Sequence, residues 1–118
     1  MSPKRGERVA PPPAVDGYDL IYGSNEAIKG WQDLCSQAAS ATRTAYFAIT
    51  SNPQPAPPTD KHHPLKFDLA TGKYNGDVFP QWQYEVTGGA RIWYLVDTAR
   101  RRVIVTYAST RHPKATDR

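Results

Sequence analysis

The chain has 118 residues, of which 39% are hydrophobic and 22% are charged, and this composition is typical of one globular domain rather than of a disordered or fibrous chain. Its single cysteine, Cys35, excludes an internal disulfide and a cysteine-based zinc cluster. No apolar run approaches the ~18 residues that a membrane span needs, and no apolar signal core follows the basic N-terminus. We therefore expect a soluble protein of the cytoplasm.

The net charge of +4 is unevenly placed along the chain. Residues 1–60 carry five lysines and arginines against six acidic residues, whereas residues 61–118 carry ten against five. A positive C-terminal half favours RNA, a ribosome, DNA or an acidic protein as the partner. A solvated face would produce the same skew, so charge alone does not decide the function.

The N-terminal half of the sequence predicts a tail, a short strand and one or two helices. Residues 1–16 end in a proline-rich run and predict a flexible tail ahead of one domain over residues 17–118. Residues 18–22 predict a short strand, and Ser24 is a suitable N-cap for the helix that follows. Residues 39–50 either continue this helix or form a second one. Apolar residues recur at steps of three and four, as on one buried helix face: Ile28, Trp31, Leu34, Cys35 and Ala38. On this pattern Cys35 is a small buried hydrophobe.

The C-terminal half predicts strands. The prolines between residues 53 and 58 end all helix, because proline lacks the amide donor and clashes with the preceding turn. The predicted segments are then an apolar stretch at 65–69, a loop at 72–76 and strands at 78–86, 91–97 and 102–109. This order predicts an α+β domain, with one or two helices packed on one face of a mostly antiparallel sheet of about four strands.

The last two predicted strands gather aromatic and basic side chains. Because side chains alternate between faces, Ile92, Tyr94 and Val96 are expected on the helix side. If the turn between these strands contains an odd number of residues, Arg91 lies opposite Ser109 and shares a face with Arg111; an even turn puts the two arginines on opposite faces. In the odd register, one face of the hairpin carries the side chains of Arg91, Trp93, Val105, Tyr107 and Arg111. Guanidinium groups bind phosphate oxygens and rings stack on bases. The alternative is that the rings are core and the arginines a solvated rim.

A histidine pair, His62 and His63, follows the proline-rich loop directly before a strand. An imidazole there offers a proton that exchanges near neutral pH. Adjacent residues of an extended chain point apart and the chain has only three histidines, so we expect no metal site. Two exposed loop histidines without a function are the alternative.

Several segments, in order, carry a resemblance. They are His63-Pro64-Leu65-Lys66, residues 82–86, a Gly-Gly turn, Arg91-Ile92-Trp93-Tyr94 and, after the last strand, Arg111-His112. Together they resemble the RelE/ParE toxin superfamily, closest to its RelE, YoeB and YafQ branch. Members of that branch resemble one another in an (H/E)-P-L-K start of the second strand, an R-(I/L)-x-Y third strand, and a final strand that ends in Arg or His before a polar tail. The similarity covers roughly residues 18–118, and its specific part is residues 63–112.

The resemblance implies a RelE-like fold and the toxin of a type II toxin–antitoxin system. Such a toxin is an endoribonuclease (an mRNA interferase) that inhibits translation by cutting mRNA in the ribosomal decoding site, through attack by a 2′-OH and without a metal or other cofactor. The implied catalytic residues are His63 as base, Arg91 with Lys66 as phosphate clamp, Arg111 for charge stabilisation and His112 as acid. The implied RNA contacts are Lys66, Trp82, Tyr84, Trp93, Tyr107 and Lys114.

The implied partners are a cognate antitoxin, with which the chain would form a hetero-oligomer, and the ribosome with its mRNA; no membrane is implied. Two alternatives stay open. One is a ParE-like poison of DNA gyrase, which shares the fold and needs no catalytic set. The other is a member that has lost activity and acts as a binding or regulatory module. Trp82 and Tyr84 stand where RelE itself has lysines, and the terminal tyrosine of several relatives is absent, which favours this last alternative.

Overall fold

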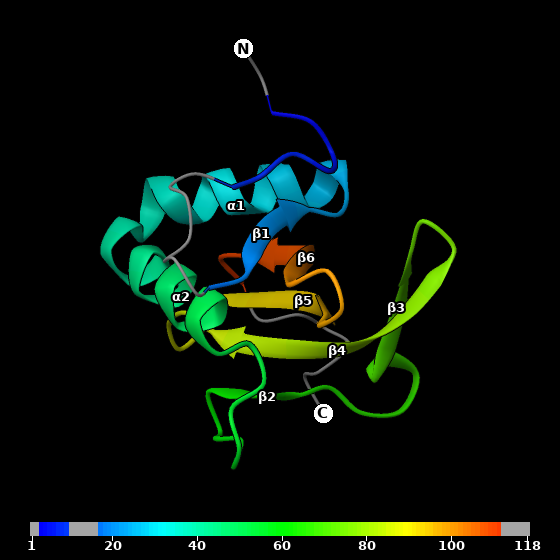
Figure 1. The fold of residues 1–118 in the computed structure, drawn as a ribbon. Helices are drawn as coiled ribbons and strands as arrows, with labels where there is room; N and C mark the ends of the chain where they lie inside the picture. The colour runs from blue at the N-terminus through cyan, green and yellow to red at the C-terminus, as the bar shows by residue number, and fades with distance from the viewer. Residues whose placement is uncertain (1–2, 10–16, 112–118) are drawn as a thin grey trace.

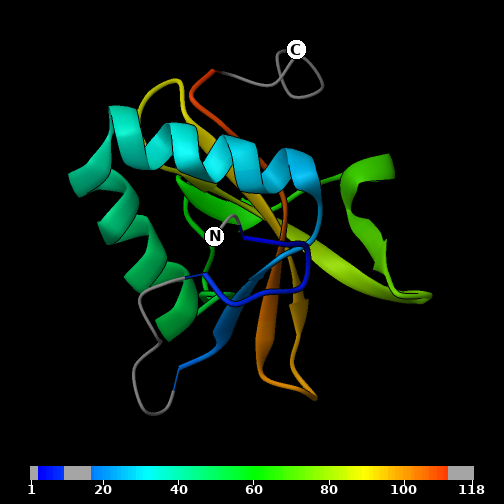
Figure 2. The ribbon, with the colours of Figure 1, turned by 90° about the horizontal axis from the view of Figure 1, so that it is seen from above.

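The computed structural model describes residues 3–9 and 17–111. Two helices lie on one face of a mixed sheet of six strands, so the chain is an α+β domain of two layers (Figures 1 and 2). The sheet order is β1-β6-β5-β4-β2, and β3 pairs with β4 outside this path. The elements are β1 (Asp19–Tyr22), α1 (Asn25–Gln37), α2 (Ala39–Ser51), β2 (His62–Pro64), the 3-10 helix η1 (Phe67–Leu69), β3 (Thr71–Tyr74), β4 (Asp77–Glu85), β5 (Arg91–Asp97) and β6 (Arg102–Ser109).

The helices begin and end for local reasons. Ser24 caps α1, since its side-chain oxygen accepts a hydrogen bond of 3.0 Å from the backbone N–H of Ala27. At Ala38 the backbone leaves the helical region (φ −144°), so α2 is a second helix and not a continuation. The buried face of α1 includes Ile28, Trp31 and Leu34, as predicted, but Cys35 is exposed and its predicted burial is wrong. Cys35 lies ~100° around the helix from Leu34, close to the angle of Ile28, and so at the edge of the buried face rather than at its centre. None of the helices within residues 3–9 and 17–111 is long and apolar enough to cross a membrane.

Gly30 lets α1 approach β6. A Cβ at Gly30 would lie 1.8 Å from the carbonyl oxygen of Ala108, which is backbone and cannot move aside. We expect Gly30→Ala to lower the free energy of unfolding by about 3 kcal/mol, because overpacking forces helix and strand apart. Gly88→Ala is the matched control: a Cβ there meets nothing within 4 Å, and the expected change is below about 1 kcal/mol. Urea unfolding measures both, and equal effects of the two substitutions would contradict this account.

The core lies between the helices and the central strands. Every residue of β5 is buried, and Ile92, Tyr94 and Val96 face the helix-side core, as the alternation predicted. A second, smaller core occupies one end of the opposite face, where the β3–β4 hairpin packs against β5 and β6. The two cores make β5 the centre of the molecule.

A β-bulge sets the register of the last hairpin. The turn between Asp97 and Arg102 has four residues, an even number, yet Arg91 lies opposite Ser109 as expected for an odd one. The extra residue is in β6: Trp93 pairs with Tyr107 and Tyr94 with Val105, so Thr106 is left over. The bulge also turns Val105 to the helix-side core, so its predicted place beside Trp93 and Tyr107 is wrong.

The sheet has six strands rather than about four, and it is mixed because β1 runs parallel to β6. The two strands that were not predicted are β2, of three residues, and β3, of four residues. β3 falls where a loop was predicted. Asn75 and Gly76 both have positive φ (51° and 87°), as a tight hairpin turn between β3 and β4 requires. An Asn-Gly pair is the strongest short-range signal for such a hairpin, so the sequence contained the evidence for it.

The N-terminal segment covers the outer edge of β1. The backbone N–H of Val9 donates to the carbonyl of Leu20 (2.6 Å), Gly6 donates to Tyr22 (2.7 Å), and Val9 is fully buried. Within the predicted tail, residues 6–9 therefore belong to the folded domain. Residues 10–16 lie outside the described part of the chain.

Candidate functional site

The face of the sheet opposite the helices, which we call the helix-free face, carries the strongest set of functional candidates. Beyond the small second core, one residue from each of four strands forms a row across it: His63 (β2), Gln83 (β4), Trp93 (β5) and Tyr107 (β6). Residues that pair across neighbouring strands lie on the same face, with Cβ atoms ~5 Å apart. The row therefore joins strands that are up to 44 residues apart in sequence.

Side-chain contacts link the members of this row. The indole Nε1–H of Trp93 donates to Oε1 of Gln83 (2.8 Å), and Nε2 of Gln83 lies 3.4 Å from Nε2 of His63. The rings of Trp93 and Tyr107 lie 4.9 Å apart between centroids. Gln83 and Trp93 are only 5% and 8% exposed, whereas His63 and Tyr107 are half-buried. A ligand would meet the imidazole and the phenol, while the amide and the indole support them from beneath.

Arg91 is in a different position from the one that a phosphate clamp needs. Its Nη2 lies 3.2 Å from Oε1 of Glu85, and its Nη1 donates to the carbonyls of Thr87, Gly88 and Ala90 at 3.0–3.3 Å. The side chain is 8% exposed. The guanidinium therefore holds the turn between β4 and β5, and its charge is balanced by Glu85.

These contacts predict a structural role for Arg91. Arg91→Met should lower the free energy of unfolding by about 2–4 kcal/mol, because it leaves a partly buried carboxylate and three carbonyls without their donor. In a double-mutant cycle with Glu85→Gln, the coupling energy should exceed about 1 kcal/mol. The control is Arg100→Met, whose side chain is largely exposed although it pairs with Asp97; it should cost less than about 1 kcal/mol. An unchanged stability of Arg91→Met would mean that its guanidinium is available to a ligand.

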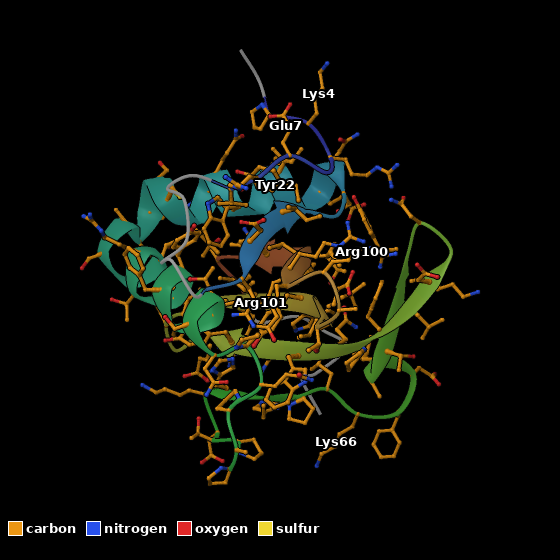
Figure 3. All side chains as sticks on the ribbon, in the orientation of Figure 1. Lys4, Glu7, Tyr22, Lys66, Arg100 and Arg101 are labelled. Carbon is orange, nitrogen blue, oxygen red and sulfur yellow. The ribbon has the colours of Figure 1, made fainter. Side chains whose placement is uncertain are left out.

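Two other predicted cations, Arg111 and Lys66, are exposed. Arg111 lies beyond the end of β6, where its backbone N–H donates to the hydroxyl of Ser109 (2.9 Å). Because it lies in a bend and not in the strand, strand register does not assign it to a face. Lys66 follows β2 and points away from the molecule on the side opposite the helices (Figure 3). Its neighbour Phe67 is 91% exposed with φ +56°, a conformation that bulky residues rarely adopt.

The structure brings together some of the predicted site residues and not others. His63 and Arg91 share the face but stand two strands and two residues apart, about 12 Å between Cα atoms. Trp82 and Tyr84 lie on the helix side, where Trp82 is part of the core, so they do not share a surface with Trp93 and Tyr107. His112 and Lys114 lie outside the described residues.

His62 points to the helix side, so the two histidine rings diverge as predicted. It is 8% exposed and its Nε2–H donates to the hydroxyl of Tyr94, which in turn donates to the carbonyl of Pro53 (2.6 Å). Its ring also has edge contacts with Trp82 and Tyr84. Burial lowers the pKa of His62 to about 4, so this imidazole is neutral at pH 7 and ties β2 and the end of α2 to β5.

Sequence reasoning missed three residues of this region. Gln83 and Glu85 alternate with Trp82 and Tyr84 along β4, and this period-two pattern could have indicated a polar row on the second face. Phe67 stands between two charged residues, Lys66 and Asp68, which indicates an exposed ring. No local pattern indicates that Glu85 neutralises Arg91, because that contact depends on the pairing of β4 with β5.

Comparison of the chain with protein-family models, with curated proteins and with solved structures found no match.

Proposed function

We propose that this chain is the toxin of a type II toxin–antitoxin system, a RelE-like endoribonuclease that acts on ribosome-bound mRNA in the cytoplasm and is neutralised by an antitoxin. The observation that carries the proposal is the position of His63. Its half-buried imidazole stands at the end of an ordered row on the helix-free face, three residues before the exposed Lys66. This arrangement combines a group suited to proton transfer with a cation suited to phosphate.

Cleavage of RNA without a metal needs three groups. A base takes the proton of a ribose 2′-OH, a cation steadies the phosphate, and an acid protonates the leaving 5′-oxygen. His63 takes the first role, and Lys66 with Arg111 the second. His112 takes the third on the strength of its place in the sequence. The 2′-oxygen bonds to phosphorus as the bond to the 5′-oxygen breaks, which yields a 2′,3′-cyclic phosphate and a 5′-OH.

Arg91 has a supporting role in this proposal, which departs from the role that the resemblance implies. Its guanidinium already has an anionic partner, Glu85, so phosphate would have to displace a carboxylate that is itself partly buried. Tyr107 and the exposed ring of Phe67 are better placed than Trp93 to stack on bases, since Trp93 is covered.

Primer extension on mRNA from cells that express the chain tests the proposal. Cuts at codon-spaced positions in translated mRNA, absent when translation is blocked, are the expected result. DNA breaks without mRNA cuts would indicate a gyrase poison instead and would overturn the proposal.

The pairing of Arg91 with Glu85 favours one further candidate, a binding or regulatory module of the same fold without catalysis. A neutralised arginine supplies a rigid turn but no free positive charge for a transition state. This candidate predicts that the chain binds its protein partner while neither mRNA nor DNA is cut.

A further inference from the structure

We propose that Trp93 and Gln83 are positioning residues that hold His63 in a single tautomer, with the proton on Nδ1 and the lone pair of Nε2 available on the helix-free face. The catalytic meaning of this arrangement rests on the proposed function. The tautomer itself does not, because it follows from the hydrogen-bond chemistry of three side chains and one carbonyl.

The Trp93 indole fixes the orientation of the Gln83 amide. The indole nitrogen of Trp93 is a donor only, and it lies 2.8 Å from one end of that amide. That end must be the carbonyl oxygen, because an NH₂ group there would face another N–H. The NH₂ end of Gln83 is therefore turned toward His63, at 3.4 Å from its Nε2.

The His63 ring has a hydrogen-bond partner at each of its two nitrogens. The carbonyl of Pro64 accepts only, and it lies 3.0 Å from Nδ1, so Nδ1 carries the proton. The NH₂ group of Gln83 donates only, so Nε2 must accept. Two independent neighbours thus select the same tautomer, which is the less common one for free histidine in water.

The consequence is a base that is ready to act. An Nε2 without a proton can accept one from a hydroxyl, whereas an Nε2–H cannot. The contact with Gln83 is longer than the usual ~2.9–3.0 Å of a strong hydrogen bond, so a substrate hydroxyl can compete for the same lone pair. Gln83 and Trp93 are buried, so water does not reach the amide. A flipped amide would leave the indole N–H without an acceptor, and this cost keeps the amide in one orientation.

NMR of the imidazole nitrogens tests the inference on the full chain at a pH where imidazoles are ordinarily neutral. The imidazole signals that disappear in the His63→Gln variant are assigned to His63. We expect the wild-type His63 ring to show a protonated Nδ1 and an unprotonated Nε2. In Gln83→Glu a carboxylate can accept from both Trp93 and His63 while the Pro64 carbonyl still accepts from Nδ1, so Nε2 should gain a proton. In Trp93→Phe the amide is free to turn, so the Pro64 carbonyl alone selects the tautomer and the shifts of the two nitrogens should move toward each other.

Gln81→Glu is the matched control. Gln81 lies two residues away on the same strand and face and is equally buried, but it bonds Leu69 and Thr106 instead of His63. The His63 spectrum should not change in this variant. Averaged shifts in the wild type, or no change in Gln83→Glu and Trp93→Phe together, would overturn the inference. Since the spectrum does not depend on RNA, a confirmed tautomer in a chain that fails to cut mRNA would refute the proposed function and leave the positioning intact.

Discussion

His63→Ala is expected to lower the rate of mRNA cleavage by about 10²–10⁴-fold, the usual contribution of a general base. The imidazole is the described group best placed to take the 2′-OH proton, because it is half-buried, carries an acceptor nitrogen and belongs to a row that fixes its direction. The measurement is the single-turnover rate on programmed ribosomes with purified variants.

Chemical rescue separates a catalytic role of His63 from a structural one. Imidazole added to the buffer should restore part of the activity of His63→Ala, because a small base can enter the space that the side chain leaves. It should have no effect on Arg91→Met, whose defect is in the turn between β4 and β5. A His63→Ala variant that cuts mRNA at the wild-type rate would show that another group is the base.

The second large effect is a loss of stability in acid that originates at His62. Burial holds the pKa of this imidazole at about 4 in the folded chain, below the ordinary ~6.5 that applies when the chain is unfolded. Between these values the unfolded chain binds a proton that the folded one does not. The contribution of His62 is therefore complete above pH 6.5 and is lost as the pH falls toward 4, at about 1.4 kcal/mol per pH unit and about 3 kcal/mol in all.

Urea unfolding between pH 4 and pH 7 measures this dependence, with His62→Phe as the variant that cannot titrate. In this range the free energy of unfolding should change less steeply with pH in His62→Phe than in the wild type, by the ~1.4 kcal/mol per pH unit that corresponds to one proton. Burial alone would raise the pKa of Asp97, but hydrogen bonds from Arg102 and Arg100 outweigh burial and lower this pKa. Asp97 therefore affects the stability mainly below pH 4. Equal slopes in wild type and His62→Phe would contradict the assignment.

The parts of the fold that depend on local patterns were predictable. Ser24 as cap and the bounds of β5 and β6 follow from side-chain chemistry and from runs of β-branched and aromatic residues. The face assignment of Ile92, Tyr94 and Val96 follows from strand alternation.

The parts that depend on distant pairing were not predictable. The bulge at Thr106 reverses the face of Val105, and a strict two-residue period cannot indicate an inserted residue. The same limit applies to Arg91: its position opposite Ser109 was expected, but its neutralisation by Glu85 arises only when β4 pairs with β5. His63 was identified from its sequence neighbours, whereas Gln83 and Trp93, which orient it, come from strands 20 and 30 residues away.

A single 2′-deoxy nucleotide at the cut site of a synthetic mRNA tests the central claim most directly. On programmed ribosomes, the all-ribose message should be cut to a 2′,3′-cyclic phosphate and a 5′-OH, and the message that lacks this one 2′-hydroxyl should stay intact. Equal cutting of both messages, or products that end in a 3′-OH and a 5′-phosphate, would contradict the account, because the proposal requires this 2′-hydroxyl to be the attacking group.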